Sequence, residues 1–262
     1  MFLAQISDTH LLSLKENDPV AVKRADNLMR CVETINQLPV APQAVVHTGD
    51  MINFGADNDY GLACEILSQL KAPFFPTLGN RDSRPDFIKS FLMSKMVFDE
   101  TAFCQYRAML KDFDVVAADT KSLSRNIGTS CPERIAQLQE LLERDRDKPV
   151  FIFLHHPPTR IEALKNPLQF DELENARAFT DLFDRFDNVV RILCGHTHRS
   201  DIVQMGRHQA STLPSLATDV RLDQYPNTLV DEPIFQVHEL HEDGHVTSMS
   251  HFAHSKPEAA LA

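Results

Sequence analysis

The chain has 262 residues, of which 43% are hydrophobic and 24% are charged, and its formal net charge at pH 7 is −11. This length and composition are typical of a globular protein with one large α/β domain, or one domain with an appended lobe. The negative charge and the lack of a block of Lys and Arg disfavour long nucleic acid as a partner. A small anionic substrate is still compatible, because bound metal ions can dominate the field of a cleft.

The start of the chain and its cysteines favour a cytoplasmic location. Asp8 and His10 interrupt the first apolar residues, and no basic segment precedes them, so the sequence predicts no secretory signal. No segment approaches the roughly 20 apolar residues that a membrane helix needs. The five cysteines are scattered and form no C-x-x-C pair, which argues against a disulfide framework and a zinc ribbon. We therefore expect reduced core cysteines and no contact with a membrane.

The first part of the chain alternates short apolar segments with amphipathic ones. Strands are predicted at residues 2–7, 44–47 and 74–78, and helices at 19–38 and 57–70. This βαβαβ order predicts a largely parallel sheet with helices packed on its faces.

The same alternation returns in the middle of the chain. Strands are predicted at residues 115–118, 150–154 and 189–194, and helices at 132–146 and 171–186. The fold class is therefore α/β over most of the length.

After Cys194 the pattern changes to short strands, which we expect to be antiparallel and to form a second sheet packed on the first. They are predicted at residues 202–205, 208–212, 234–240 and 245–251. Asp243-Gly244 is a typical hairpin turn between the last two.

One domain is predicted over residues 1–254. Within it, residues 213–233 contain three prolines and are predicted to form a long loop or small lobe. Residues 255–262 are predicted to be a frayed tail.

Possible metal ligands follow five of the predicted strands. The five segments are Asp8-x-His10, Gly49-Asp50, Gly79-Asn80-Arg81-Asp82, His155-His156-Pro157-Pro158 and Gly195-His196-Thr197-His198. Open α/β sheets place their sites at the carboxyl ends of strands. The sequence therefore brings Asp, Asn and His side chains to one edge.

These side chains suit a pair of metal ions. Oxygen and imidazole donors fit two divalent or trivalent first-row ions better than a structural zinc held by thiolates. A shared carboxylate can bridge two ions about 3.5–4 Å apart, as in enzymes of phosphoryl chemistry. Taken alone, D-x-H and G-D are common turns, and His155-His156-Pro157 also fits a strand end with a buried histidine. The occurrence of all five segments in order favours the metal centre.

This ordered set, D-x-H, G-D, G-N-x-D, H-x-P and G-H-x-H, resembles the calcineurin-like metallophosphoesterases. The close spacing of Asp8, Asp50 and Asn80 resembles their bacterial class III branch, the cyclic-nucleotide and glycerophosphodiester phosphodiesterases. The resemblance covers residues 1 to about 212. It implies a four-layer α/β/β/α sandwich of two mixed sheets flanked by helices, and two bound ions of iron, manganese, zinc or cobalt.

The resemblance also assigns roles to the site residues. The first ion would be held by Asp8, His10, Asp50 and His198. Asp50 would bridge to a second ion, held also by Asn80, His155 and His196. The family places the ligand of its H-x-P motif on the first histidine, which leaves His156 as a neighbour.

Arg81 departs from the family pattern, which usually reads G-N-H-[DE]. The family histidine is taken to contact the phosphoryl group or to help the leaving group depart. Arginine stays charged near neutral pH, but it binds phosphate oxygens through a rigid fork of donors. We therefore expect an electrostatic role for Arg81, beside the catalytic roles of Asp50 and Asn80. The alternative is that Arg81 pairs with Asp82 or another acid and faces away.

The resulting hypothesis is a dinuclear metal-dependent phosphodiesterase acting on small phosphodiesters such as cyclic nucleotides or glycerophosphodiesters. A hydroxide held by the ions would attack phosphorus in line. The alternatives are a phosphomonoesterase, protein phosphatase or nuclease of the same superfamily, and a non-catalytic metal-binding scaffold. We also expect a homodimer or larger assembly, formed through residues 213–251.

Overall fold

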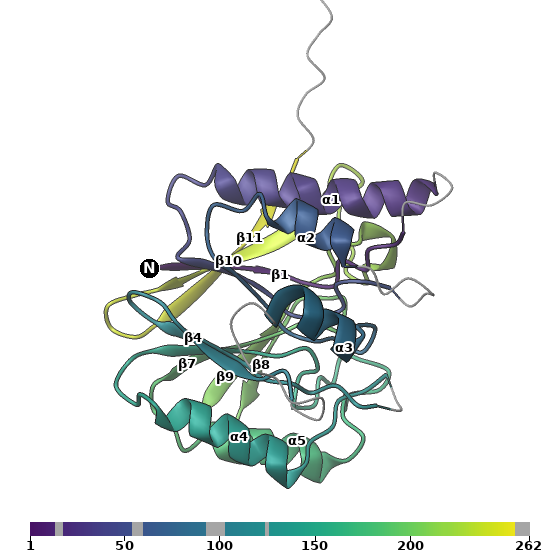
Figure 1. The fold of residues 1–262 in the computed structure, drawn as a ribbon. Coiled ribbons are helices and arrows are strands. Elements are labelled where there is room, and N and C mark those ends of the chain that lie inside the picture. The colour runs from purple at the N-terminus through teal and green to yellow at the C-terminus, as the bar shows by residue number, and fades with distance from the viewer. Residues whose placement is uncertain (14–17, 54–59, 93–102, 124–125, 255–262) are drawn as a thin grey trace, which may run out of the picture.

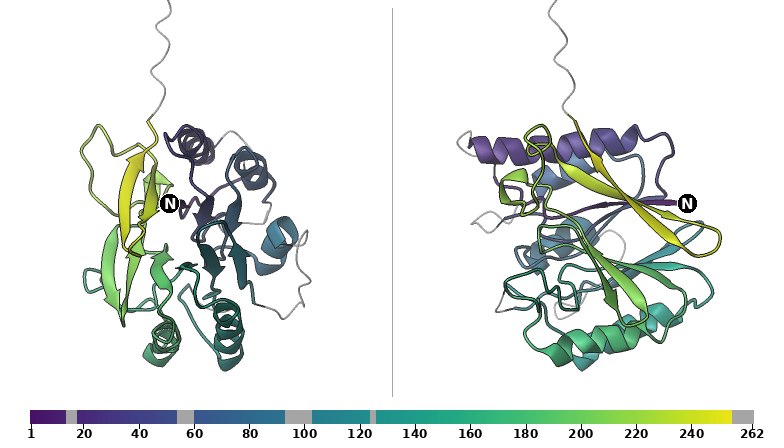
Figure 2. Two further views of the ribbon diagram at one scale, coloured as in Figure 1. Left: turned by 90° about the vertical axis from the view of Figure 1, so that its left-hand side faces the viewer. Right: turned by 180° about the vertical axis from the view of Figure 1, so that it is seen from behind.

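The computed structural model describes residues 1–13, 18–53, 60–92, 103–123 and 126–254. Two β-sheets lie face to face between two layers of helices (Figures 1 and 2). Figure 1 shows α1 (Pro19–Asn36) and α2 (Gly61–Leu67) along one side, and α4 (Pro132–Glu143) and α5 (Leu173–Phe183) along the other. The predicted α/β sandwich of two mixed sheets flanked by helices is confirmed.

The first sheet has the strand order β11-β10-β1-β2-β3. Its strands are β1 (Phe2–Ile6), β2 (Ala44–His47), β3 (Phe74–Pro76), β10 (Ile234–Leu240) and β11 (Val246–Phe252). Strands β1, β2 and β3 are parallel, as the βαβαβ order requires, and β10 is antiparallel to both β1 and β11.

The second sheet has the order β4-β5-β6-β7-β9-β8. Its strands are β4 (Tyr106–Met109), β5 (Asp114–Ala117), β6 (Val150–Phe153), β7 (Val189–Cys194), β8 (Asp201–Met205) and β9 (His208–Thr212). The inner strands β5, β6, β7 and β9 are parallel, and the edge strands β4 and β8 are antiparallel to their neighbours.

The prediction that the four late strands form a separate second sheet is wrong. Strands β8 and β9 extend the sheet of β7, whereas β10 and β11 extend the sheet of β1. Strand β9 is also parallel to β7 rather than antiparallel. The edge of each parallel sheet carries unpaired backbone N–H and C=O groups, so the late strands satisfy two existing edges.

Some short elements were not predicted from the sequence. They are β4, α3 (Arg84–Phe87), the π-helical turn η2 (Ile88–Leu92) and the 3₁₀ turn η3 (Thr218–Val220). Helix α2 begins at Gly61, within the helix predicted at 57–70. The first residues of that predicted helix, and the whole tail predicted at 255–262, lie outside the described residues.

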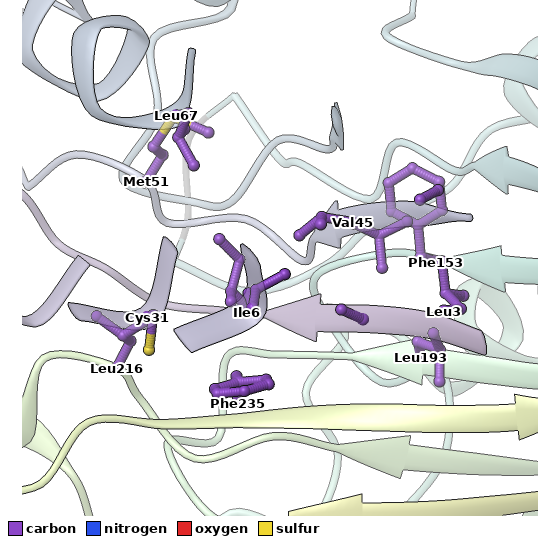
Figure 3. Packing of buried hydrophobic residues seen from close by; sticks show 14 of the residues in the cluster. Leu3, Ile6, Cys31, Val45, Met51, Leu67, Phe153, Leu193, Leu216 and Phe235 are labelled. Atoms are coloured by element: carbon purple, nitrogen blue, oxygen red, sulfur yellow. The ribbon is translucent and has the colours of Figure 1, made fainter. Parts of the chain in front are cut away.

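Apolar side chains fill the space between the two sheets (Figure 3). Leu3 and Val45 from the first sheet meet Phe153 and Leu193 from the second, and all four are fully buried. This core fixes the two sheets against each other and so positions the loops at their carboxyl ends.

Two further predictions concern cysteines and membranes. None of the five cysteines, all of which lie in the described residues, forms a disulfide, and Cys64 and Cys131 are only half-buried. Within the described residues, no helix is both long and apolar enough to cross a membrane.

Candidate metal centre

The loops after β1 and β2 are joined by backbone hydrogen bonds. The backbone N–H of Asp8 donates to the carbonyl of Gly49 at 3.1 Å, and that of His10 donates to the carbonyl of Asp50 at 3.0 Å. Because β1 and β2 are parallel, both loops leave the same edge of the sheet. Three predicted ligands are thus brought side by side.

Asp8, His10, Asp50 and His198 form the first group of possible ligand atoms, all within 4.8 Å of one another. His198 Nε2 lies 3.0 Å from His10 Nε2 and 3.4 Å from Asp8 Oδ1. His10 Nε2 lies 3.8 Å from Asp50 Oδ2. The group joins loops from both sheets, since His198 follows β7.

A second group adjoins the first through the other oxygen of Asp50. Asp50 Oδ1 lies 3.5 Å from His155 Nε2. Asn80 Oδ1 lies 3.0 Å from both His155 Nε2 and His196 Nδ1. Asp50 therefore presents one oxygen to each group, which is the placement that a bridging carboxylate needs.

His156 also lies beside the second group. The ligand atoms of His155, His156 and His196 fall within 4.8 Å of one another, and the rings of His156 and His196 are 4.4 Å apart. His156 Nδ1 contacts Thr120 Oγ1 at 2.8 Å. His156 is thus a close neighbour of two predicted ligands.

Two predicted imidazole ligands are held through Nδ1, the nitrogen that faces away from the site. His155 Nδ1 lies 2.7 Å from the carbonyl of Thr48, and His198 Nδ1 lies 2.9 Å from the carbonyl of Val220. A carbonyl can only accept, so these Nδ1 atoms donate, and each Nε2 faces the site, where its lone pair can bind a metal ion in place of a proton. This arrangement is typical of metal-bound histidines.

His196 is held in the opposite sense. Its Nε2 lies 3.0 Å from Gln169 Oε1, while its Nδ1 faces Asn80. The Nε2–H of His196 donates a hydrogen bond to the amide oxygen of Gln169. This leaves the lone pair of Nδ1 directed into the second group.

The backbone at these positions is unusual. Asp8, His10, Asp50, His196 and His198 all have φ between 44° and 70°, and they are the non-glycine residues with positive φ in the part of the chain that the structure describes. Such values cost energy for residues with a side chain and are concentrated at functional sites. All five were predicted as metal ligands from the sequence.

Glycines allow the loops to approach closely. A Cβ at Gly79 would collide with the backbone and carboxylate of Asp50, and one at Gly195 would collide with Ser7 Oγ. These positions therefore need glycine for the strand ends to meet.

The two carboxylates are ionised in the absence of metal. Burial opposes this, but the hydrogen bond and charge of His198 lower the pKa of Asp8 to about 2. Burial likewise opposes the ionisation of Asp50, and the charge of His155 lowers its pKa well below the usual range. Burial disfavours protonated His155, yet the charge of Asp50 raises the pKa of His155 to about 9. A cation in the site would take the place of that proton.

Two other predicted ligands are neutral imidazoles. Burial lowers the pKa of His10 to about 4 and that of His196 to about 3. Neutral imidazoles and ionised carboxylates are the forms that bind metal ions, so the donor set fits a pair of cations.

Asp82 holds the second and third loops together. Its buried carboxylate accepts hydrogen bonds from the backbone N–H groups of Gly79 at 2.8 Å, Met51 at 3.1 Å and Ile52 at 3.2 Å, and from the hydroxyl of Tyr60 at 3.0 Å. The loops that carry Asp50 and Asn80 are thus joined around one carboxylate.

Sequence reasoning did not find Gln169 or Lys121. Lys121 Nζ donates to the carbonyl of Asn80 at 2.7 Å and so restrains the residue before Arg81. Neither residue belongs to a motif, and both lie in loops far along the chain from the ligands they contact. No sequence pattern marks these two residues, and only their positions in the fold identify them.

The sequence model of the calcineurin-like phosphoesterases matches residues 1–200. The chain belongs to this family. The resemblance inferred from the five motifs is therefore confirmed. Enzymes of the calcineurin-like phosphoesterase family use a pair of divalent metal ions, and the two groups around Asp50 supply residues able to hold such a pair.

Relatives with assigned activities align over most of this calcineurin-like phosphoesterase. A probable glycerophosphodiester phosphodiesterase, GpdQ, of Arcobacter nitrofigilis is 27% identical over 257 residues, which cover 95% of this chain and 92% of the relative. The 3′,5′-cyclic adenosine monophosphate phosphodiesterase CpdA of Vibrio vulnificus is 25% identical over 251 residues, covering 94% and 88%. These are the two kinds of enzyme that the motif resemblance indicated.

A solved structure supports the fold assignment. The dimetal phosphatase of Danio rerio superposes with a TM-score of 0.68 at 16% identity, covering 97% of this chain and 96% of its own. At this identity the match concerns the arrangement of sheets and helices.

Proposed function

We propose that this calcineurin-like phosphoesterase hydrolyses small phosphodiesters at a dinuclear metal centre. The observation that carries the proposal is the position of Asp50 between two groups of ligand atoms, with Oδ2 near His10 and Oδ1 near His155. A single buried carboxylate shared in this way suits two ions a few ångströms apart.

The first ion would be held by Asp8, His10, Asp50 and His198, and the second by Asp50, Asn80, His155 and His196. Oxygen and imidazole donors suit iron, manganese, zinc or cobalt. When bound, the ions supply Lewis acidity and lower the pKa of a water ligand.

The protein itself contributes position and charge. Asp50, held by the N–H of Arg81, would fix the spacing of the two ions. The Arg81 guanidinium would offset negative charge on the phosphoryl oxygens, and Lys121 would keep the Asn80 carbonyl in place.

The relatives support diesters as the substrate class. Both GpdQ and CpdA are named for diester hydrolysis, one of glycerophosphodiesters and the other of a cyclic nucleotide. A cyclic or small linear phosphodiester carries one negative charge, which a site with two cations and an arginine can accept despite the overall charge of −11.

A substrate panel tests the proposal. Manganese-loaded protein should cleave bis(p-nitrophenyl) phosphate faster than p-nitrophenyl phosphate, and at least one 3′,5′-cyclic nucleotide, 2′,3′-cyclic nucleotide or glycerophosphodiester should be a substrate. Faster hydrolysis of the monoester would favour the phosphatase alternative. Stoichiometric metal with no hydrolysis of any ester would favour the non-catalytic scaffold.

Assembly and location stay predictions, and we propose a cytoplasmic homodimer or larger homo-oligomer formed through residues 213–251. Part of this segment packs against the metal centre, because the hydroxyl of Ser215 donates to the carbonyl of Asp8 at 2.8 Å and His198 contacts Val220. Association through the remainder would therefore act close to the site. A sedimentation mass near that of the 29.7 kDa monomer at micromolar concentration would contradict the assembly.

A further inference from the structure

A buried row of hydrogen bonds runs from the metal centre to the outer strand of the first sheet. From the inside outward, its members are Asp8, Ser7, Thr48, Gln5, His238 and Ser248. Only Ser248 is exposed, and the other five are fully buried. Most side chains packed between the two sheets are apolar, so a continuous polar row there is costly unless every member is hydrogen-bonded.

The inner half of the row ends on a predicted ligand of the first ion. The hydroxyl of Ser7 donates to Asp8 Oδ2, and the hydroxyl of Thr48 donates to Ser7 Oγ at 2.7 Å. Thr48 Oγ1 in turn accepts from Gln5 Nε2 at 3.1 Å.

The outer half crosses strands β1, β10 and β11. Gln5 Oε1 lies 3.0 Å from His238 Nε2, and His238 Nδ1 lies 2.7 Å from Ser248 Oγ. His238 on β10 is directly opposite Ser248 on β11 in the strand register, so their side chains share one face of the sheet.

The direction of every hydrogen bond in the row is fixed by one carbonyl. Gln5 Nε2 donates to the carbonyl of Cys194 at 3.0 Å as well as to Thr48, and a carbonyl can only accept. The oxygen of the Gln5 amide therefore faces His238, which must donate from Nε2 and accept from Ser248 at Nδ1. All donors point towards Asp8, which is the arrangement in which successive hydrogen bonds strengthen one another.

We propose that this row is a positioning relay for the first metal ion, with His238 as its remote positioning residue. By fixing the donor of Ser7, the relay holds Asp8 Oδ2 and leaves Oδ1 directed at His10 and His198, 3.8 and 3.4 Å away. The affinity of the first ion then depends on His238, although the side chain of His238 does not contact Asp8. The inference rests on the proposed dinuclear function.

The side chains of the relay reach the first group through Asp8, whereas the side chain of Gln169 holds His196 in the second group. The relay touches the second group through the main chain, because the carbonyl of Thr48 faces His155 Nδ1 and the backbone N–H of His196 donates to Asp8 Oδ2 at 3.1 Å. These main-chain contacts are kept in every side-chain variant, so a substitution in the relay acts on the first ion. Burial, helped by the charge of Arg191, lowers the pKa of His238 to about 3, so His238 stays neutral and the direction of the row is constant at neutral pH.

Calorimetric titration of the metal-free protein with Mn²⁺ tests the relay. Three proteins are compared: wild type, His238→Met, which fills the space without donating, and His238→Gln, which can donate an amide N–H to Gln5. We expect His238→Met to weaken the first ion about three- to tenfold and the second less than twofold. His238→Gln should recover most of the loss, whereas a merely structural role would lower both affinities together.

The outcomes separate the relay from the proposed function. If the wild type binds two ions and His238→Met leaves the first affinity unchanged, or lowers both equally, the relay is wrong. If the wild type binds no Mn²⁺, the proposed function and the relay fall together. Should His238→Met not fold, Thr48→Val keeps the branched shape and removes the hydroxyl between Gln5 and Ser7. It should weaken the first ion at least as much, and Thr48→Ser should restore it.

Discussion

The backbone N–H of Arg81 donates a hydrogen bond of 2.7 Å to Asp50 Oδ1, the same oxygen that lies 3.5 Å from His155 Nε2. Residue 81 is therefore anchored through its main chain beside the carboxylate that joins the two ligand groups. Its side chain begins at the site whichever amino acid is present, so substitutions at position 81 can test the side chain without moving the loop.

Arg81→Ala should lower kcat/KM for a phosphodiester about ten- to hundredfold. A charge-assisted hydrogen bond to phosphate is worth roughly 1.5–3 kcal/mol, which corresponds to this loss. Metal content should not change, because the main-chain bond to Asp50 is kept. Unchanged kinetic constants would show that the guanidinium points away from the substrate.

Arg81→His should recover part of that loss and introduce a pH-dependent step. Histidine has an ordinary pKa near 6.5 and changes charge within the working range, whereas arginine stays charged throughout. Profiles of kcat against pH for the two proteins test this. A wild-type profile identical to that of Arg81→His would contradict the assignment.

Gln169→Leu should weaken the second ion about ten- to hundredfold and leave the first within about twofold. Its amide oxygen fixes the His196 tautomer, and loss of such a partner typically has this effect on metal affinity. Mn²⁺ titration measures both ions. Gln204→Leu, an exposed glutamine on β8, is the matched control and should leave both unchanged. Equal loss of both ions in Gln169→Leu would contradict this role.

Asp82→Asn should destabilise the metal-free protein by about 1–3 kcal/mol. Four donors converge on this carboxylate, and an amide would turn an N–H group towards some of them. Tyr60→Phe removes one of these donors, together with the acceptor of the Ser83 backbone N–H, and should cost about 0.5–1.5 kcal/mol. Urea unfolding measures the stability of both variants. An Asp82→Asn protein as stable as the wild type would show that the four hydrogen bonds to Asp82 do not stabilise the fold.

The stability of the metal-free protein should fall in acid partly because of His238. Its pKa is about 3 in the folded protein and 6.5 ordinarily. Below pH 6.5 the unfolded chain therefore binds a proton that the folded chain does not. The free energy of unfolding falls by about 1.4 kcal/mol per pH unit for this group until the pH approaches 3.

His238→Gln cannot titrate and should remove that contribution. Urea unfolding at pH 5, 6 and 7 would show a smaller pH slope in the variant, by about 0.9 proton between pH 5 and 6 and about half a proton between pH 6 and 7. His10, His47 and His196 also have lowered pKa values, whereas that of His155 is raised, and these groups contribute to the slope of both proteins. Equal slopes for variant and wild type would show that His238 takes up its proton in the folded protein as readily as in the unfolded chain.

The sequence could predict that these candidate ligands lie together because each closely follows a strand. Strand ends are marked by apolar runs and by the glycines at positions 49, 79 and 195, and parallel strands end at one edge. That edge rule places Asp50 beside Asn80 without knowledge of side-chain contacts.

The contacts behind the ligands could not be read in this way. His238 meets Gln5 because β10 pairs with β1, and Gln169 meets His196 because the loop between β6 and α5 reaches the carboxyl end of β7. The allocation of the late strands was missed for a related reason: the pattern of β10 shows that it is a strand, but not which open edge it joins.

The most direct test is the rate of bis(p-nitrophenyl) phosphate hydrolysis measured against the number of Mn²⁺ ions bound per chain, for the wild type and Asp50→Asn. Because Asp50 serves both ligand groups, the wild type should reach full activity at two ions per chain and lose it with a chelator. Asp50→Asn should bind neither ion tightly and show no hydrolysis. A metal-free Asp50→Asn protein with wild-type activity would contradict the dinuclear account.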